Sequence, residues 1–143
     1  MTLLRLRNVG ALEEAVGTPL GPGSWHTVGP SSAESFAGAT GRGTPPDVVD
    51  GLLTLSLLPR LVNEMRTVEN VRMGVNYGPN RVRFPAAVPM GARVRARAVI
   101  IGVERLPGDA AQVVTRVVVG LEDSVDPACT ADLVVRYYFA REP

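Results

Sequence analysis

Two aspartates stand where a side chain of this sequence could do acid–base chemistry. Asp47 follows two prolines in a loop, and Asp50 directly precedes an apolar segment. A carboxylate can serve as a general base when it lies within hydrogen-bond reach of the proton and has a suitable pKa. Each also has a purely structural interpretation, Asp47 as a loop residue and Asp50 as the N-cap of a helix.

Backbone N–H groups are a second source of chemistry at the same place. Those near Gly51 and Leu52, at the positive end of a buried helix, could hold a carbonyl oxygen while charge builds on it. Arg42 could pair with a carboxylate such as Asp47 or meet an anionic group of a substrate, and it could equally be a solvated loop residue.

Other reactive side chains are scarce. All 15 basic residues are arginine, and the chain has one histidine, His26, and one cysteine, Cys129. The lack of lysine excludes Schiff-base chemistry and a P-loop lysine. One histidine and one cysteine cannot build a histidine-rich zinc site, an iron–sulfur cluster or an internal disulfide, so we expect no metal and no cofactor. We expect a surface or structural role for His26 and a small buried side chain at Cys129.

The residues after Asp50 predict the element that positions these groups. Apolar residues at 52, 55, 58, 62 and 65 recur at three- and four-residue spacing. This spacing predicts a helix that continues towards Val68 and is kinked at Pro59. Upstream, we expect a helical patch over 11–16, a short strand over 25–28 and a helix over 32–40 that Gly41 closes.

The second half of the chain predicts strands. From 93 to 98, arginines alternate strictly with small apolar residues, as in a strand with one buried face. Further strands are expected over 72–84, 112–122 and 130–139, with a hairpin turn at 107–109. A lone helix before such an antiparallel meander must be wrapped by the sheet, because neither apolar surface is otherwise covered.

These elements together predict one domain over residues 1–143. Its class is α+β, with the hot-dog arrangement of a long central helix wrapped by an antiparallel β-sheet. Because the open edges of such a sheet tend to pair, we also expect a homodimer.

The composition narrows the possible partners. The chain has 45% hydrophobic residues, 20% charged residues and a net charge of +1, as is typical of a soluble globular protein. Its arginines are balanced by 14 carboxylates, so we expect no nucleic-acid partner. The apolar stretch over 51–59 is too short for a membrane span, and no secretory signal is expected at the N-terminus. We therefore expect a cytoplasmic protein without a membrane partner.

Three segments of the chain carry a family pattern in a consistent order: SFAGATG at 35–41, DGLLTLSLLPRL at 50–61 and NYGPNRVRFPAAVPMGARVRARA at 76–98. Together they resemble the MaoC-like dehydratase family, the (R)-specific enoyl-CoA hydratases of hot-dog fold. The resemblance implies syn addition or elimination of water at a thioester-conjugated double bond. It also implies a loop of pattern Gly-Asp-x-Asn-Pro-x-His, in which Asp and His hold and activate the water.

The chain departs from this pattern in the loop itself. In the run Gly41-Arg42-Gly43-Thr44-Pro45-Pro46-Asp47, Arg42 takes the aspartate position and Asp47 takes the histidine position. Only two residues separate this run from Asp50, so a lid segment that is usual in the family is missing. An arginine cannot act as a general base, and the family's water-activating pair is therefore not expected here.

The third segment supplies further candidates for substrate binding. Asn76, Tyr77 and Asn80 could orient a substrate near the helix start, or could form structural hydrogen bonds in a strand bulge at Gly78 and Pro79. The alternating arginines at 93, 95 and 97 could contact the phosphates of a CoA or carrier-protein arm, or could form a solvated strand face.

Two functions remain open on these grounds. The first is a dehydratase-like lyase or cyclase that performs conjugate addition or elimination on an α,β-unsaturated or β-hydroxy carbonyl substrate, with Asp47 or Asp50 as base. Examples are oxa-Michael ring closure and dehydration of a polyketide-type natural-product intermediate, either free or attached to CoA or a carrier protein. The second is a non-catalytic hot-dog subunit that binds substrate or partners a hydratase subunit bearing the Asp/His pair.

Overall fold

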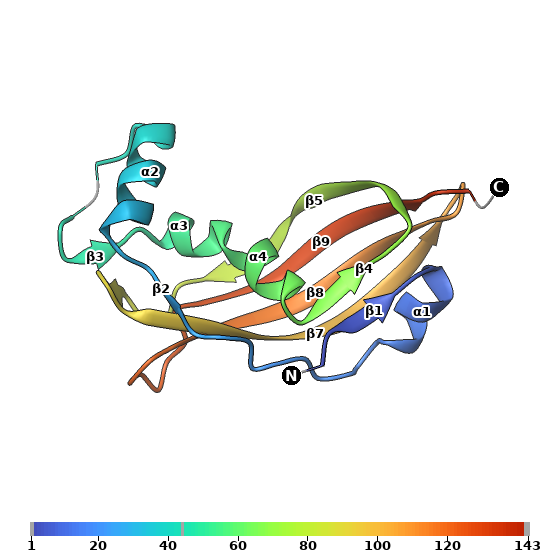
Figure 1. Ribbon diagram of the computed structural model, residues 1–143, viewed down its shortest axis with the longest axis horizontal. Coiled ribbons are helices and arrows are strands. Elements are labelled where there is room, and N and C mark those ends of the chain that lie inside the picture. The colour runs from blue at the N-terminus through green and yellow to red at the C-terminus, as the bar shows by residue number, and fades with distance from the viewer. Residues whose placement is uncertain (1, 44, 142–143) are drawn as a thin grey trace.

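A curved antiparallel sheet encloses two short helices in the computed structural model, which describes residues 2–43 and 45–141 (Figure 1). The sheet has five strands in the order β2-β7-β8-β9-β5. The elements are β1 Leu4–Leu6, α1 Val9–Glu14, β2 His26–Thr27, α2 Pro30–Thr40, β3 Val48–Val49, α3 Gly51–Ser56, α4 Leu58–Asn63, β4 Arg66–Val68, β5 Val71–Arg83, β6 Val88–Pro89, β7 Arg93–Leu106, β8 Ala110–Leu121 and β9 Cys129–Phe139.

The four long predicted strands are present as β5, β7, β8 and β9, but they do not form a simple meander. β7, β8 and β9 pair in chain order, whereas β5 pairs with β9 and lies at the far edge of the sheet. Alternation along a strand fixes which side chains are buried, and it contains no information about the neighbouring strand. The predicted alternation itself is confirmed in β7, where Val94 and Ala96 are buried and Arg93 and Arg97 are exposed.

The central helix is interrupted at Leu57, between α3 and α4. Pro59 has no N–H to donate to the turn before it, which is why the predicted kink occurs there. The predicted continuation to Val68 is wrong, because α4 ends at Asn63 and the next residues form β4. β4 runs parallel to β1 with Leu4 opposite Arg66, a partner far upstream in the sequence that local periodicity cannot reveal.

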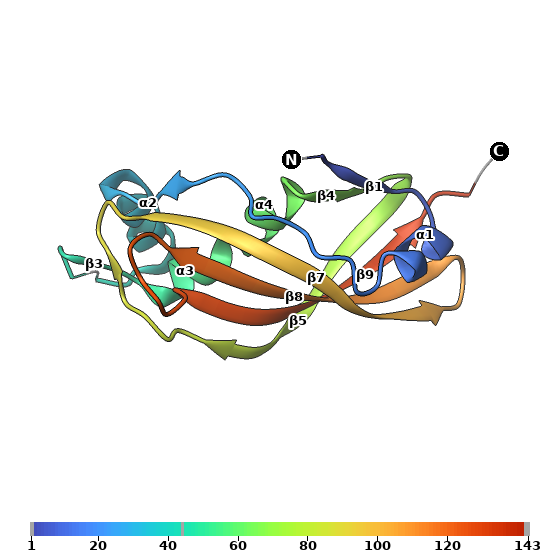
Figure 2. The ribbon, with the colours of Figure 1, turned by 90° about the horizontal axis from the view of Figure 1, so that it is seen from below.

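The core lies between the helices and the concave face of the sheet (Figure 2). The helices contribute Leu53, Leu58, Leu61, Val62 and Met65, and the strands contribute Val94, Ala96, Ala98, Val117, Val119 and Ala131. Small side chains on β7 allow the helices to approach the sheet closely. At the helix start the predicted apolar face is wrong, because Leu52 is 45% exposed and Leu53 is 5% exposed.

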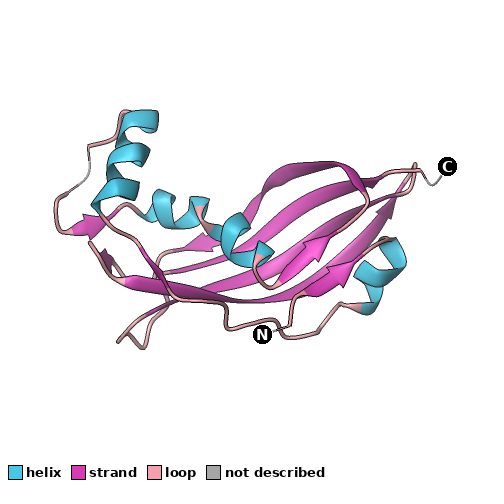
Figure 3. Cartoon of the chain, in the orientation of Figure 1, coloured by secondary structure: helices cyan, strands magenta, loops and turns pink. Residues whose placement is uncertain are grey.

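The N-terminal third forms short elements around this core (Figure 3). α2 ends where predicted, at Gly41 with φ 71°, and lies at one end of the molecule, near the end of the sheet at which β7 begins (Figure 1). Residues 17–28 run along the outer edge of β7 and bond to it, for example from the Gly17 N–H to the Ile100 carbonyl at 2.9 Å. In the described part of the chain, no helix has the length and apolar character needed to cross a membrane.

Candidate functional site

Arg42 and Asp50 form an ion pair at the start of α3. The Arg42 Nε–H donates to Asp50 Oδ2 at 2.7 Å, and the Leu52 N–H donates to Asp50 Oδ1 at 2.9 Å. Both bonds stabilise the ionised carboxylate, the one from Arg42 more strongly, and they hold the pKa of Asp50 below its ordinary value. The N-cap interpretation of Asp50 is confirmed, and the carboxylate that pairs with Arg42 is Asp50 rather than Asp47.

The backbone donors at the helix start are not equally free. The Leu52 N–H donates to Asp50, so it cannot receive a carbonyl oxygen in this arrangement. Gly51 lies against the ring of Phe84, which a Cβ at position 51 would approach to 3.1 Å. A role for the Gly51 N–H in binding a carbonyl oxygen stays a prediction.

Asp47 lies in the loop before β3 and is exposed to solvent. Its carbonyl oxygen accepts a hydrogen bond from the Met90 N–H at 2.9 Å, so β6 and the turn after it fix the backbone here. This exposure agrees with the structural interpretation of Asp47 as a loop residue. None of the ion pairs formed by residues 2–43 and 45–141 involves Asp47.

The three residues predicted to bind substrate on β5 do not converge. A register shift between Asn76 and Gly78 confirms the predicted bulge. Asn76 and Tyr77 are both exposed, but Asn76 faces the helices, whereas Tyr77 stacks on Arg136, with 4.1 Å between Cζ and the ring centre. Arg136 belongs to the set of β9 side chains that face away from the helices, so Tyr77 lies on the outer face. Asn80 is exposed.

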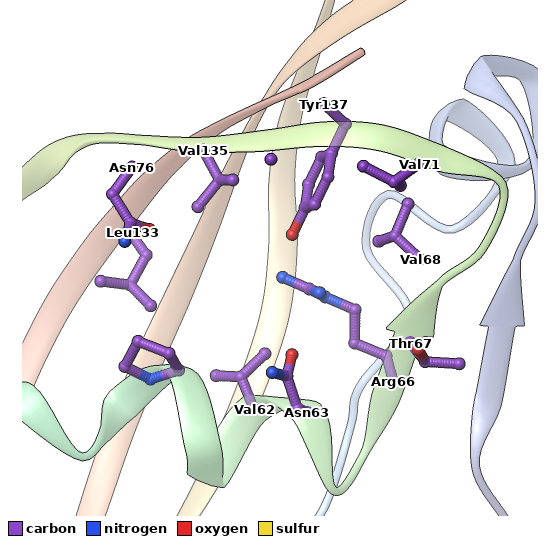
Figure 4. A pocket seen from close by; sticks show the side chains of 12 residues that line it. Val62, Asn63, Arg66, Thr67, Val68, Val71, Asn76, Leu133, Val135 and Tyr137 are labelled. Atoms are coloured by element: carbon purple, nitrogen blue, oxygen red, sulfur yellow. The ribbon is translucent and has the colours of Figure 1, made fainter. Parts of the chain in front are cut away.

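A cavity of about 370 Å³ lies on the helix side of the sheet, between α4, β4, β5 and β9 (Figure 4). Its walls are mostly apolar, and the polar side chains that reach it are Asn63, Arg66, Thr67, Asn76 and Tyr137. A second cavity of about 280 Å³ shares Pro59, Asn76, Leu133 and Val135 with it and extends along α3. This size suits a small ligand. Among the residues predicted to bind substrate, Asn76 lines both cavities.

Arg66 and Tyr137 enter the cavity without having been predicted from the sequence. Arg66 falls inside the segment where a continuing helix was expected, and the strand β4 instead directs its side chain inward. The β-branched pair Thr67 and Val68 was the one local signal for a strand at this point. Tyr137 is fixed by its position on β9, opposite Ala111 of β8.

His26 and Cys129 lie away from this cavity. His26 Nε2 is hydrogen-bonded to Glu64 Oε1, and both side chains are about one quarter exposed. Cys129 is completely buried, as predicted, and burial raises the pKa of its thiol to about 11. A thiol with so high a pKa is a poor nucleophile, which agrees with a packing role.

The sequence model of the protein family described as "MaoC like domain" matches residues 32–121, which is more than half of the chain. The chain belongs to the MaoC-like family. This MaoC-like protein is 39% identical to 3-hydroxyacyl-thioester dehydratase Z of Mycobacterium tuberculosis (strain ATCC 25618 / H37Rv), over 91% of this chain and 95% of the relative. The family assignment made from the three segments is therefore confirmed.

Solved structures confirm the hot-dog fold. A monoamine oxidase regulatory protein from Archaeoglobus fulgius superimposes with a TM-score of 0.77 at 17% identity, covering 99% of this chain and 100% of the other. An R-hydratase from Pseudomonas aeruginosa in the unliganded form gives a TM-score of 0.60 at 15% identity, covering 90% and 89%. The MaoC-like protein thus keeps the family fold even though its loop at 41–47 lacks the Asp/His pair.

Proposed function

We propose that this MaoC-like protein is a lyase that adds to, or eliminates from, the β-carbon of a carbonyl compound. The observation that carries the proposal is the mostly apolar cavity beside α4, which also contains the neutral hydrogen-bonding residues Asn63, Asn76 and Tyr137 and the cation Arg66. The 39% identity to a protein named 3-hydroxyacyl-thioester dehydratase supports a β-hydroxy or α,β-unsaturated acyl substrate. Such a substrate is either free or attached to CoA or a carrier protein.

Neither aspartate lines the cavity beside α4, so in our proposal the reacting carbon lies outside that cavity, with Asp47 as the acid–base group and Asp50 as the second candidate. Both carboxylate oxygens of Asp50 accept hydrogen bonds, one from Arg42 and one from Leu52, and these bonds lower its pKa. To act as a base, Asp50 would first have to break at least one of them. Asp47 has no such partner among the described ion pairs, and its exposed carboxylate is free to approach a substrate. The nucleophile need not be water, because a hydroxyl of the substrate can close a ring by oxa-Michael addition.

Activity assays on two aspartate variants test this proposal. The full chain is incubated with 3-hydroxyacyl-CoA and 2-enoyl-CoA thioesters, and the conjugated thioester is followed by its absorbance. We expect Asp47→Asn to lower turnover at least about tenfold, whereas Asp123→Asn, a matched change at an exposed turn with φ 60°, leaves it unchanged. If Asp47→Asn and Asp50→Asn both retain full activity, no carboxylate acts as base here.

A non-catalytic subunit is the second candidate, and one observation favours it. The ion pair between Arg42 and Asp50 occupies the helix start, and the Leu52 N–H that was expected to hold a carbonyl oxygen donates to Asp50 instead. In this case the chain binds a substrate or supports a partner subunit that carries the Asp/His pair. Native mass spectrometry of protein purified from its source separates the two: a stable homodimer counts against the partner subunit, and a heterodimer with a MaoC-like chain supports it.

A homodimer through β5 completes the proposed assembly. Residues 17–28 cover the outer edge of β7 up to Ile100, whereas β5, the other edge strand, has no strand paired on its outer side within the described residues. Three large apolar or aromatic side chains of this strand are well exposed, namely Met73, Val75 and Tyr77. An exposed edge strand of thirteen residues pairs readily with a second copy. A cytoplasmic location and a single domain over 1–143 stay predictions from the sequence.

A further inference from the structure

Arg66 is a buried cation for which the described residues provide no anionic partner. The residue is 4% exposed, and its Nε atom is fully buried with no hydrogen-bond acceptor among the described residues. None of the ion pairs formed within residues 2–43 and 45–141 includes Arg66. A guanidinium stays charged at any physiological pH, so its burial without an anion costs free energy.

The surroundings of Arg66 direct this charge into the cavity rather than compensate for it. Figure 4 shows the guanidinium pointing across the cavity toward Tyr137, whose ring centre lies 5.9 Å from Cζ. An aromatic ring at this distance gives a weak attraction and supplies no acceptor to Nε. The cavity lining, as far as the chain is described, contains no aspartate or glutamate.

The backbone of Arg66 is held firmly, so the position from which its side chain enters the cavity is fixed. Arg66 lies opposite Leu4 in the parallel pairing of β4 with β1, and the Leu4 N–H donates to the carbonyl of the preceding Met65 at 3.0 Å. Met65 is itself completely buried. A fixed, charged donor group in a cavity with apolar walls is suited to binding an anion.

We propose that this cavity binds the carboxylate of a small organic acid, with Arg66 as its anchor. One guanidinium balances one negative charge and presents two parallel N–H donors, which match the two oxygens of a carboxylate. A phosphate carries more charge than one arginine balances, and this lining offers it no second cation. The Asn63, Asn76 and Tyr137 side chains supply neutral polar groups near the anchor.

The apolar walls determine the rest of the ligand. Val62, Val68, Val71, Leu133 and Val135 surround the cavity, and the adjoining cavity continues from Leu133 and Val135 toward Leu55. A hydrocarbon chain bound at Arg66 by its carboxylate end can therefore run along α4 and α3. This assignment concerns binding, so it holds whether or not the chain acts as a lyase.

Isothermal titration calorimetry on the full chain tests the site, with octanoate as the probe. Octanamide is the matched neutral compound, and octyl phosphate is the alternative anion. We expect octanoate to bind at least about tenfold more tightly than octanamide, since a hydrogen-bonded charge pair contributes that much. Equal affinities for octanoate and octanamide would overturn the proposal. Tighter binding of octyl phosphate would overturn the carboxylate assignment.

Two variants connect the binding to Arg66. Arg66→Met keeps an unbranched side chain without the charge, and we expect it to weaken octanoate at least about tenfold while octanamide changes little. Arg97→Met removes an exposed arginine of β7 and is expected to bind octanoate like the wild type. Unchanged octanoate binding in Arg66→Met would contradict the site.

Thermal unfolding without ligand separates a binding role of Arg66 from a structural role, because the two predict opposite shifts of the unfolding midpoint in Arg66→Met. If Arg66 is a binding group kept at a cost to stability, Arg66→Met raises the midpoint of unfolding, because an uncompensated buried charge is removed. A lowered midpoint would mean that Arg66 stabilises the fold through its contacts, and would overturn its assignment as a ligand anchor.

Discussion

The carboxylate of Asp50 connects the loop that follows α2 with the first turn of α3. It accepts one hydrogen bond from Arg42, in the loop after α2, and one from Leu52, in the first turn of α3. A short loop can thus be held against the helix start by a single side chain. This structural role explains why an aspartate at position 50 is useful even if it never accepts a proton from a substrate.

The pH dependence of stability tests the state of Asp50. Because its folded pKa lies below the ordinary value of 3.8, the ionised group stabilises the fold at any pH above that value. This contribution is lost as the pH falls below 3.8 through the folded pKa, since the unfolded chain is then protonated first.

We expect Asp50→Ala to lower the free energy of unfolding by about 1 kcal/mol at pH 7 through the lost cap. The difference from the wild type should shrink in acid, measured by urea unfolding at pH 7 and near pH 3. Asp126→Ala, at an exposed position in the turn before β9, is the matched control. A difference that grows as the pH falls would contradict the assigned ionisation.

The junction of α3 with the end of β5 depends on a close contact rather than on helix propensity. Gly51 begins the helix, and Phe84 directly follows β5. A Cβ at position 51 would lie 3.1 Å from the ring, which is closer than ordinary van der Waals contact. Glycine at this position therefore allows the helix start to pack against the sheet, at some cost in helix stability.

A double-mutant cycle measures this contact. Alanine ordinarily stabilises a helix by up to about 1 kcal/mol relative to glycine. We expect Gly51→Ala to give no gain in the wild type, because Phe84 must move, and to stabilise the protein by about 0.5 kcal/mol in a Phe84→Ala background. Urea unfolding of the four proteins gives the coupling energy. If the effects of the two substitutions on the free energy of unfolding are additive, the Phe84 ring moves aside at no cost in free energy.

At the scale of the whole molecule, the two edges of the five-stranded sheet differ: the β7 side is partly covered, and the β5 side is open. Residues 17–28 hydrogen-bond to β7 up to Ile100, whereas β5 extends along the opposite side and has no buried residue. A monomer of this shape leaves the backbone groups of β5 unpaired, and dimerisation through β5 would satisfy them. The cavity that contains Arg66 lies beside this strand, so the proposed assembly and the proposed ligand site are neighbours.

A charge placed on β5 tests the assembly. Val75 is 38% exposed near the middle of the strand, and Val75→Lys would bring two like charges together in a dimer that pairs β5 with β5. We expect the wild type to be a dimer and Val75→Lys a monomer, as measured by size-exclusion chromatography with light scattering. Val125→Lys, at a fully exposed turn position, should remain dimeric. A dimeric Val75→Lys would exclude β5 as the interface.

The sequence alone determined the family, the class of fold and the elements whose signals are local. Strict alternation from Arg93 to Ala98 predicted the buried face of β7, and Asp50 before an apolar run predicted a helix cap. Pro59 predicted the kink, because a missing N–H is a property of the residue itself. The changed loop at 41–47 was likewise visible, since a motif is read directly from residue types.

Only the tertiary structure decided which distant groups meet. The pairing of β5 with β9, the parallel pairing of β4 with β1 and the choice of Asp50 as the partner of Arg42 all depend on the path of the chain in space. Arg66 is the clearest case. In the sequence it is one of fifteen arginines, and only the turn of the chain after α4 buries it, leaving a charge that the described protein groups do not balance.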